Sequence, residues 1–466
     1  MKEDGRGCKM ARRKVLVIAY YFPPSGTAGT YRTLKFVKYL SEFGYQPIVL
    51  TAKENSYGRL DYDVSLLREV PPDIKIIRTP TFEPRFVLKL LAKLGMSRLA
   101  RATFVLDPDV LLTWVLPVIW VGLRIIKREN VELIYSSSSP HGVHLGALVL
   151  SKLTHKPWVA DFRDPWTGHE YFDALNALYE KIAQGAELLV VKTASRTIMT
   201  SSGHKRMLLS RYPDVDPSKV VVITNGYDEE DFSGIVRDGH KKFTIAYTGW
   251  FYDEYVPVSR QSSARYRVRR FIEERVFRLR PPRPAGDTHS PAYFLRALRA
   301  LLDERPEIEA ELCVNLVGKV SHRNRQLIYD LHLERVVYIL GHVPHREAIS
   351  YLINADVLLL VLGSKRGHSC FLPGKLYEYM GAGKPILALI PDGDAKDLIL
   401  ATNTGVVVNP RDINAIKEAI YDLYLKYKSG VPATFPNMML VQQYERRNLT
   451  QRLALLFTEI LDERSL

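Results

Sequence analysis

The sequence is poor in cysteine and contains no apolar run long enough to cross a bilayer. Its three cysteines, Cys8, Cys313 and Cys370, are far apart and match no metal-ligand spacing. A disulfide framework is therefore not expected, and a reducing cytoplasm fits this usage best. The uncharged, strongly apolar run at residues 110–123 contains Pro117, whereas a spanning helix needs about 20 residues. We expect a core helix or an interfacial segment there.

The N-terminus also lacks the pattern of a signal peptide. Basic residues precede an apolar run from Val15 to Phe22, but Pro23 and Pro24 stop this run and no small-residue cleavage site follows. A signal peptide would need such a site after its apolar region. We therefore interpret the run as a first buried β-strand.

Acidic residues are not in excess. Lysine and arginine number 65 against 51 aspartates and glutamates, which gives a formal net charge of +14. This imbalance favours an anionic partner, namely nucleotide phosphate, nucleic acid or an acidic membrane surface. With 466 residues, of which 46% are hydrophobic and 25% charged, the chain is predicted to be globular and to form two domains.

Strand-like apolar runs alternate with helical patterns along the whole chain, which predicts parallel α/β sheets. The strands expected in the first half are residues 14–22, 46–52, 74–80, 131–138, 156–162, 187–195 (which could also be helical) and 219–225. Those expected in the second half are residues 243–249, 313–319, 336–343, 356–362, 384–390 and 405–410. Two successive parallel sheets with a cleft between them are the simplest architecture.

The composition also suggests where the domains begin and end. No internal repeat is visible, and a polar, glycine-rich segment resembles an interdomain linker. The predicted organisation is an N-terminal domain at 12–226, a linker at 227–242, a C-terminal domain at 243–435 and, at 436–466, a helix that packs back onto the N-terminal domain. Residues 256–288 contain nine arginines and three acidic residues without a strand signature. We interpret them as an insertion in the C-terminal domain.

The first candidate ligand site is the strand-to-helix loop within residues 20–40. After two prolines, Gly26 and Gly29 permit tight backbone turns, and an amphipathic helix begins near Thr30. Free amide groups and the positive end of the helix dipole at such a position favour an anion. Because glycine loops are common in α/β proteins, an ordinary connection is the alternative.

A second candidate loop follows the strand expected at 131–138. Ligands bind at the carboxyl ends of parallel strands, and His141 lies there after four consecutive serines. The alternative is a polar loop that caps the next helix. His144, inside that helix, is interpreted as structural.

A third candidate loop follows the strand expected at 156–162 and concentrates charge. Asp161, Arg163 and Asp164 stand within four residues, and three charges cannot be buried unpaired without a large cost. They either pair as a structural clamp or face the cleft, where Arg163 could hold a phosphate or a sugar.

The fourth candidate is "SCFLPGKLYEYMGAGKPILALIPDG", residues 369–393. Gly374 and Lys375 begin a predicted helix, where amide groups and the lysine charge favour a diphosphate. Glu378, one turn further, is placed to accept hydrogen bonds from two ribose hydroxyls. The alternative is an i,i+3 salt bridge, which contributes only roughly a few tenths of a kcal/mol and leaves the flanking glycines unexplained.

Five segments follow one another along the chain: "FPPSGTAG", "ADFRDPW", "VVITNGYDEEDF", "LVGK…VYILGHVPHREAISYLINADVLLLV" and "PGKLYEYMGAGKPILA". Together they resemble the family-4-like glycosyltransferases of the GT-B fold, over nearly the whole chain. The second and the last are similar to variants found in enzymes of polysaccharide and cell-surface glycan assembly. The resemblance implies an α/β protein of two Rossmann-like domains facing across a cleft, which transfers a sugar from a nucleoside-diphosphate donor with retention of configuration.

The resemblance also assigns the donor site. Glu378 would bind the ribose and Lys375, with Gly374, the diphosphate. Gly26 and Gly29 would meet the phosphates from the other domain. The remaining residues expected at the donor are Gly249, Lys319, Leu376 and, beside the base, Gly341, His342 and Val343.

The residues expected to take part in catalysis are His141, Arg163 and Asp164, with His141 beside the reacting sugar. No committed protein nucleophile, metal ion or cofactor is expected. The leaving phosphate would help to deprotonate the acceptor, while preorganised positive groups stabilise it.

Two positions depart from the family pattern. The family has a second glutamate eight positions before the ribose-binding one, and Cys370 stands there. An arginine and a lysine usually follow the first strand of the C-terminal domain, whereas "YTGWFYDEY" supplies neither. Arg163, Lys319 or an arginine of the insertion could replace them.

An anionic membrane surface is a further expected partner. Residues 85–94 place four apolar side chains on one helix face and three basic ones on the other, as in helices that lie on an anionic interface. Residues 104–120 add aromatic and apolar bulk. An ordinary helix with a solvated basic face is the alternative. We expect a cytoplasmic protein, peripheral on the inner face of the membrane, with a glycan or lipid-linked acceptor.

Three other functions compete with glycosyl transfer. Nucleic-acid binding is suggested by the net charge and the arginine-rich insertion, but no helix-turn-helix, zinc or RNA-binding signature is present, so no nucleic-acid partner is expected. A nucleotide-sugar 2-epimerase would share the fold and the ribose-binding glutamate. An inactive accessory subunit would explain Cys370 and the missing basic pair.

Overall fold

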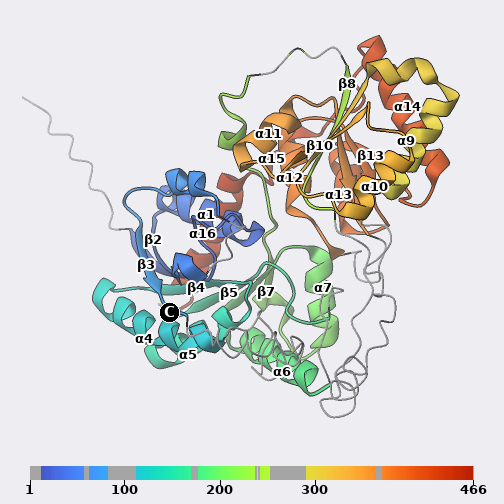
Figure 1. Ribbon diagram of the computed structural model, residues 1–466. Coiled ribbons are helices and arrows are strands. Elements are labelled where there is room, and N and C mark those ends of the chain that lie inside the picture. Colours follow the sequence, from blue (N-terminus) through green and yellow to red (C-terminus); the bar gives the residue numbers. More distant parts are fainter. Residues whose placement is uncertain are drawn as a thin grey trace, which may run out of the picture.

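The computed structural model describes residues 12–56, 62–81, 112–168, 177–236, 239, 242–251, 290–363 and 370–464. These residues form two domains, each built on a parallel sheet that is covered by helices on both faces (Figure 1). The predicted α/β fold with two Rossmann-like domains is therefore confirmed. The segments 85–94 and 256–288 and residues 104–111 lie outside the described residues.

The sheet of the N-terminal domain has the strand order β3-β2-β1-β4-β5-β6-β7, and its strand pairs are parallel. Leu16 and Ile18 of β1 face one core cluster, and Val15 and Val17 face another, as expected for a strand that is buried on both faces. The strands are β1 (Arg13–Ala19), β2 (Tyr45–Ala52), β3 (Lys75–Thr79), β4 (Leu133–Ser137), β5 (Trp158–Phe162), β6 (Arg196–Met199) and β7 (Val220–Val222).

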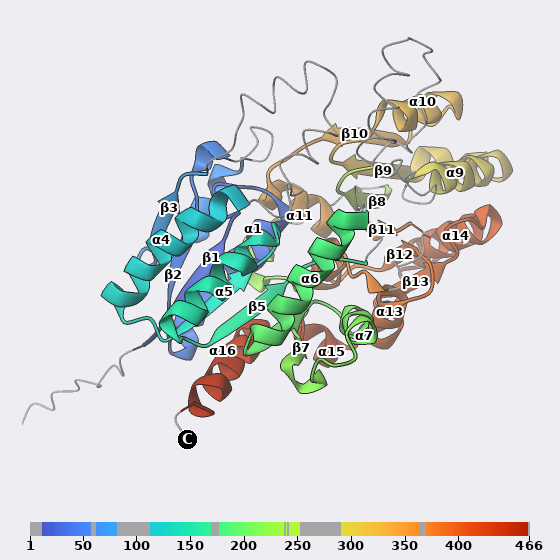
Figure 2. The ribbon, with the colours of Figure 1, turned by 90° about the horizontal axis from the view of Figure 1, so that it is seen from below.

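Helices cover both faces of this sheet (Figure 2). The helices on the first face are α4 (Leu112–Glu129), α5 (Gly142–Thr154), α6 (Ala177–Thr193) and α7 (Ser202–Arg211). The opposite face carries α1 (Ala28–Leu40) and α16 (Arg446–Asp462), which comes from the end of the chain. The last helix thus belongs to the core of the first domain.

The sheet of the C-terminal domain has the order β10-β9-β8-β11-β12-β13 and is also parallel. Its strands are β8 (Phe243–Thr248), β9 (Leu312–Val317), β10 (Val337–Gly341), β11 (Val357–Val361), β12 (Ile386–Leu389) and β13 (Gly405–Val408). One face packs on α9 (Ala292–Glu304), α10 (His322–Asp330) and α14 (Ile413–Ser429). The other packs on α11 (His345–Ile353), α12 (Gly374–Ala382), α13 (Asp394–Thr402) and α15 (Met438–Gln442).

The chain crosses between the domains twice, and the two crossings touch. Tyr227 donates its amide to the carbonyl of Tyr444 at 3.1 Å, and Arg446 donates its amide to the carbonyl of Tyr227 at 2.8 Å. A Cβ at Gly226 would collide with the Tyr444 carbonyl, so glycine permits this close approach. The expected linker is therefore packed here, and the 3-10 helix η6 (Glu229–Phe232) follows at once.

The predicted strand at 187–195 needs adjustment, whereas a helix is present over the described part of the run at 110–123. Residues 187–193 continue α6, and the run was ambiguous because a short apolar stretch does not distinguish a strand from a buried helix. The strand β6 directly after it was not predicted. Residues 112–123 are helical, within α4, and Pro117 lies inside that helix. None of the helices within the described ranges is both long and apolar enough to span a bilayer.

Candidate functional site

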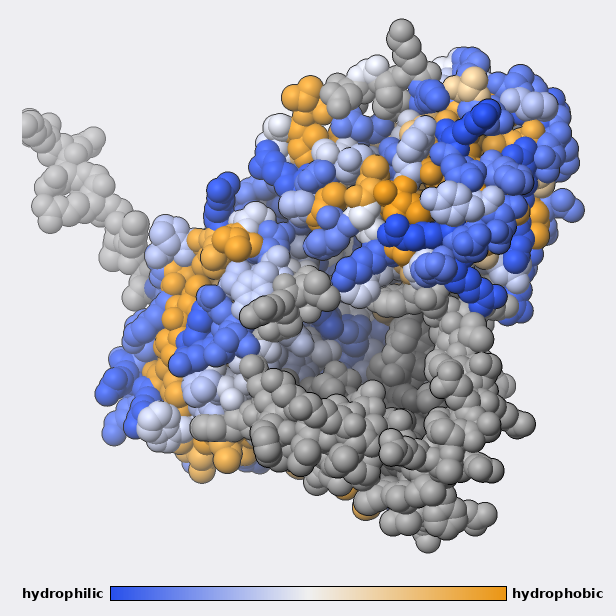
Figure 3. Space-filling model, viewed as in Figure 1, coloured by the Kyte–Doolittle hydropathy of each residue, from blue (hydrophilic) through white to orange (hydrophobic). Residues whose placement is uncertain are grey.

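The surface is hollowed where the two domains meet (Figure 3). On the N-terminal side, the β1–α1 loop brings Gly29 into the first turn of α1. A Cβ there would collide with the guanidinium of Arg163, so the absence of a side chain lets Arg163 lie directly against the start of α1. No side chain of the described residues caps this helix. Of the predicted pair Gly26 and Gly29, Gly29 thus lies beside an arginine that stands 134 positions later in the sequence.

The predicted charge cluster after β5 divides into two separate ion pairs. Arg163 pairs with Asp164 at 3.0 Å and reaches Ser139 at 3.4 Å. Asp161 is instead fully buried and accepts two hydrogen bonds of 2.8 Å from Arg32 of α1. Asp161 is therefore a structural residue, and only Arg163 and Asp164 keep an exposed surface.

The Arg32–Asp161 pair ties the sheet to the interdomain crossing. Arg32 also donates to the backbone carbonyls of Ile223 at 2.9 Å and Thr224 at 2.6 Å. Burial opposes the charge of Arg32, but Asp161 more than offsets this and raises the pKa of the guanidinium. Sequence analysis did not find this arginine, because nothing in α1 signals a partner so far along the chain.

His141 lies at the start of α5 and is buried. Its Nε2 is 3.0 Å from the backbone carbonyl of Asp164, so this nitrogen carries the proton, because a carbonyl only accepts. Its ring stacks on Trp166 at 5.3 Å, and its Nδ1 has no hydrogen-bond partner among the described residues. Burial lowers the pKa of His141. The ring is thus held neutral, with one free acceptor nitrogen.

His144, one turn further, has a different environment. It is completely buried, its Nδ1 meets Ser136 Oγ at 2.8 Å and its ring stacks on Phe162 at 4.5 Å. Burial lowers its pKa well below the ordinary value. These contacts agree with a structural role.

On the C-terminal side, α12 begins with the predicted residues Gly374 and Lys375. Gly374 is exposed, and no side chain in the described part of the chain caps the helix start. Lys375 Nζ donates to the hydroxyl of Tyr247 at 2.9 Å and lies 4.2 Å from the centre of its ring. Burial lowers the pKa of Lys375 to about 8. Free amides and a cation thus meet at one helix end, which favours an anion.

Gly249 explains how Lys375 reaches this position. Its φ is +131°, and a Cβ there would collide with Lys375 Nζ. Gly318 and Gly341 lie beside it, joined by a 2.6 Å hydrogen bond from the Gly318 amide to the Gly341 carbonyl. Lys319 covers the ring of Trp250 at 4.0 Å. The ends of β8, β9 and β10 thus bring these predicted donor residues together.

Three other predicted residues near this edge of the sheet differ in their exposure. His342 is exposed, Val343 is half-buried and Leu376 is fully buried in the core of the C-terminal domain. The Leu376 side chain is therefore a packing residue, and only its backbone lies at the helix start.

Glu378 lies one turn beyond Lys375 and forms an ion pair that the sequence did not predict. Its Oε1 is 3.1 Å from Nε2 of His345, the first residue of α11. Burial opposes ionisation of Glu378, but the hydrogen bond and charge of His345 lower its pKa. Burial likewise opposes protonation of His345, and Glu378 raises its pKa. The His345 ring also lies 4.8 Å from that of Tyr31 in α1, so Glu378 stands at the domain junction.

Three carboxylates near this junction are close enough together to suggest a metal site. They are Glu69, Asp228 and Asp231. However, Lys35 Nζ lies 2.6 Å from Glu69, 2.7 Å from Asp228 and 2.6 Å from Asp231. The lysine ammonium thus occupies the position that a cation would take.

Arg446 is a third buried cation near the crossing, and it has no ion-pair partner among the described residues. Its side chain forms no hydrogen bond or ion pair with the residues described, and its buried Nη1 is unsatisfied. Burial, together with the positive charge of Arg32, lowers the pKa of Arg446 to about 10. Sequence analysis did not single it out, because it reads as a surface residue of an amphipathic helix.

Cys370 occupies the position of the family's second glutamate, and here it lies against the other domain. Its carbonyl accepts a hydrogen bond of 2.8 Å from the Ser201 hydroxyl. Next to it, Asp394 accepts the Gly203 amide at 2.8 Å and pairs with Arg206 at 3.1 Å. This is a further contact between the two domains.

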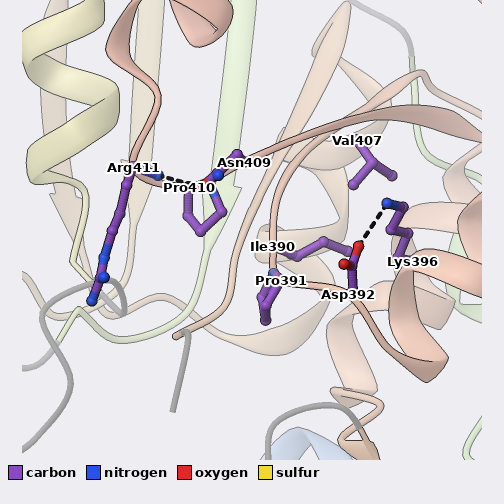
Figure 4. Close-up of a pocket in the computed structure, with 8 residues that line it drawn as sticks. All are labelled: Ile390, Pro391, Asp392, Lys396, Val407, Asn409, Pro410 and Arg411. Carbon is purple, nitrogen blue, oxygen red and sulfur yellow. Dashed lines mark hydrogen bonds and ion pairs between the residues drawn. The ribbon is translucent and has the colours of Figure 1, made fainter. Parts of the chain in front are cut away.

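A surface pocket of about 350 Å³ lies at the ends of β12 and β13 (Figure 4). Its wall includes Asp392 and Lys396, which are joined by a 2.6 Å ion pair, as well as Asn409 and Arg411. None of the predicted site residues lines it. The pocket therefore does not coincide with the predicted donor residues.

Comparison with known families places the chain in a defined class. The family model described as Glycosyltransferase Family 4 matches residues 30–231, and that of Glycosyl transferases group 1 matches residues 286–426. One match falls in each domain. The two-domain fold is that of the GT-B proteins, and with these matches the chain is a glycosyltransferase of the GT-B fold. No curated protein matches it.

Solved structures share the fold at low sequence identity. Anabaena HepE in complex with UDP and glucose has a TM-score of 0.60 and 15% identity, over 96% of this chain and 100% of its own. A glycosyltransferase from Rickettsia africae has a TM-score of 0.60 and 16% identity, over 97% and 99%. The UDP-GlcNAc 2-epimerase of Methanocaldococcus jannaschii has a TM-score of 0.53 and 10% identity, over 96% and 99%. At these identities the likeness concerns the fold alone.

Proposed function

We propose that the protein transfers a sugar from a nucleoside-diphosphate sugar to a glycan or lipid-linked acceptor, with retention of the anomeric configuration. The observation that carries this proposal is the pair Lys375 and Glu378, a cation and an ionised carboxylate one turn apart on α12. Glu378 faces the junction with the N-terminal domain, because its partner His345 contacts Tyr31.

The donor is proposed to bind along α12. Its diphosphate would lie at the uncapped helix start, where Lys375 supplies the charge, and the ribose hydroxyls would donate to Glu378. Gly29 and Arg163 would approach the phosphates from the other domain. HepE, a structural neighbour, was crystallised with UDP and glucose, which supports a nucleotide-sugar donor of this kind.

The transfer step would depend on stabilising the leaving diphosphate. Lys375 and Arg163 are preorganised, because a phenol fixes the first and Asp164 the second, and fixed positive groups act most strongly where charge develops. His141 would lie beside the reacting sugar. The acceptor hydroxyl would lose its proton to the leaving phosphate, so no protein nucleophile is required.

The first experiment is a binding and product assay. Calorimetry with UDP-, GDP- and ADP-sugars should identify a donor, and NMR of the glycosylated product should show the same anomeric configuration as in that donor. Glu378→Gln, which keeps size but removes charge, should weaken donor binding, while Lys396→Gln in the separate surface pocket should not. Full donor affinity in the Glu378 variant would overturn the ribose assignment.

The same assay separates transfer from epimerisation, which a neighbour of this fold carries out. Labelled sugar on an acceptor supports transfer. An epimerised free nucleotide sugar, formed without acceptor, would favour the alternative.

We also propose that helices α4, α5 and α6 face an anionic membrane that presents the acceptor. Leu116 and Trp120 of α4 and Leu178 of α6 are 71%, 59% and 68% exposed. Basic residues are interleaved with them, and Arg124 lies over the Trp120 ring at 3.3 Å. This combination fits an interface of anionic lipids. The double variant Leu116→Asp/Trp120→Asp should no longer sediment with anionic liposomes. The control variant Met439→Asp, which changes an exposed residue of α15, should still sediment with them.

A further inference from the structure

His345 lies within one of the quoted sequence segments, but the donor assignment gives it no role. The chain leaves β10, passes the exposed His342 and enters α11 with His345 as its first residue. The side chain is 13% exposed, and its Nε2 lies 3.1 Å from Oε1 of Glu378, which is 29% exposed. One oxygen of the proposed ribose-binding carboxylate is therefore engaged by a neighbouring helix.

Three parts of the chain meet around this histidine. Tyr31 of α1 contributes the ring at 4.8 Å, and Asp231 of η6 and Lys35 of α1 act on His345 electrostatically with opposite signs. Glu378 of α12 completes the group. His345 is thus in contact with both domains at once.

A glutamate needs help to present its carboxylate in one direction. Its side chain has several rotatable bonds, and fixing such a side chain is opposed by entropy. A charge-assisted hydrogen bond from His345 fixes one oxygen, while the carboxylate keeps the acceptor capacity of its second oxygen. Two neighbouring ribose hydroxyls require this fixed, ionised geometry.

We propose that His345 is a positioning residue for the ribose: it holds Glu378 in the orientation that accepts the ribose hydroxyls, and its contact with Tyr31 makes that orientation depend on the apposition of the two domains. The inference rests on the proposed function, because it presupposes that a nucleoside diphosphate binds along α12. Its opposite is a purely structural ion pair, which would affect stability without affecting ribose recognition.

The experiment compares a ribonucleotide with its 2′-deoxy form. Calorimetry is carried out with UDP and 2′-deoxy-UDP, and with the GDP and ADP pairs if UDP does not bind. The wild-type protein should prefer the ribonucleotide by about tenfold or more, since a hydrogen bond to a charged group is lost in the deoxy form. In His345→Ala this preference should fall to about twofold or less, mainly through weaker binding of the ribonucleotide.

Two variants distinguish positioning from general damage. His345→Gln can still donate a hydrogen bond to Glu378, so it should retain most of the preference. Lys375→Met should weaken both nucleotides by the same factor and leave the preference unchanged, because it acts on the diphosphate. Tyr31→Ala should lower the preference to a value between those of the wild type and His345→Ala.

The outcomes separate the two proposals. If the wild-type protein binds none of the nucleotides, the proposed function fails. If it binds them and His345→Ala keeps the wild-type preference, the proposed function stands and the positioning role is overturned. If His345→Ala does not fold, Tyr31→Ala decides: a preference equal to that of the wild type overturns the proposed dependence on the apposition of the two domains.

Discussion

Lys35 on α1 and Lys375 on α12 both lie near the domain junction, but their partners differ. Lys35 is 2% exposed and touches three carboxylates within 2.7 Å. For Lys375, the structure describes only a phenol, that of Tyr247, at hydrogen-bond distance. Burial acts against the charge of both, yet the carboxylates raise the pKa of Lys35, while burial lowers that of Lys375 to about 8. A cation with satisfied partners serves the fold, and one without them is available to a ligand.

The same contrast separates two arginines at the crossing. Arg32 is paired with Asp161 and two backbone carbonyls, whereas Arg446 has no such partner within the described ranges. An unpaired buried charge is costly. The junction thus contains two kinds of charge. Some, such as Lys35 and Arg32, are fully paired within the protein (saturated) and join the domains, whereas others near Glu378 lack such partners (unsaturated).

Removing the saturated lysine should have the largest effect. Lys35→Met leaves Glu69 and Asp231 without the cation they share and Asp228 with Lys38 alone. Removing one partner of a buried pair costs about 3–5 kcal/mol. Urea unfolding should show this loss of stability. The matched control is Lys38→Met, because Lys38 is more exposed and shares Asp228; its loss should be about 1 kcal/mol or less. Equal losses in the two variants would contradict the assignment of Lys35 to the fold.

Removing the unsaturated lysine should reverse this pattern. Lys375→Met should leave stability unchanged or slightly raised, because no carboxylate of the described residues loses a partner. Donor nucleotide affinity should fall by about 10- to 100-fold, as expected for a lost contact to a charged phosphate. Calorimetry with the donor and unfolding of the same samples give both values. A loss of stability with unchanged affinity would make Lys375 structural.

The two lysines should also differ in their response to pH. Lys375 is protonated below its pKa of about 8 and loses its charge as the pH rises through that value, so donor affinity should fall between about pH 7 and 9.5. The raised pKa of Lys35 keeps its charge over this range, and its contribution to stability is lost only at still higher pH. In Lys375→Arg the decline should disappear, because arginine stays charged. A decline of the same size in that variant would indicate another titrating group.

Sequence patterns predicted the parts of the fold that rest on periodicity and glycine. The strands from β1 to β5 and from β7 to β13 correspond to apolar runs, since a strand buried on both faces needs one. The segment 369–393 was predicted to begin a helix with Gly374 and Lys375, and α12 begins at Gly374. Whether these residues bind a donor stays a prediction.

The charge network at the junction could not be predicted in the same way. Arg32 and Lys35 occupy α1 positions that read as the polar face of an amphipathic helix, yet α16 and the crossing bury them. Their partners Asp161 and Asp231 lie more than a hundred positions away. His345 gave no signal either, because one histidine at a helix start has no spacing to match. Such pairs depend on the tertiary fold, which no local pattern encodes.

Replacing a third lysine, Lys319, should cause the smallest loss of donor affinity. Lys319 is half-buried over Trp250 and has no carboxylate partner among the described residues, so it is unsaturated like Lys375, but it is not at a helix start. Lys319→Met should weaken donor binding by only about two- to fivefold, because a partly exposed charge interacts weakly with an anion. Calorimetry beside Lys375→Met measures the difference. If the two losses were equal, Lys319 would supply the charge that the missing basic pair after Gly249 provides in the family, and the helix start would no longer distinguish the two lysines.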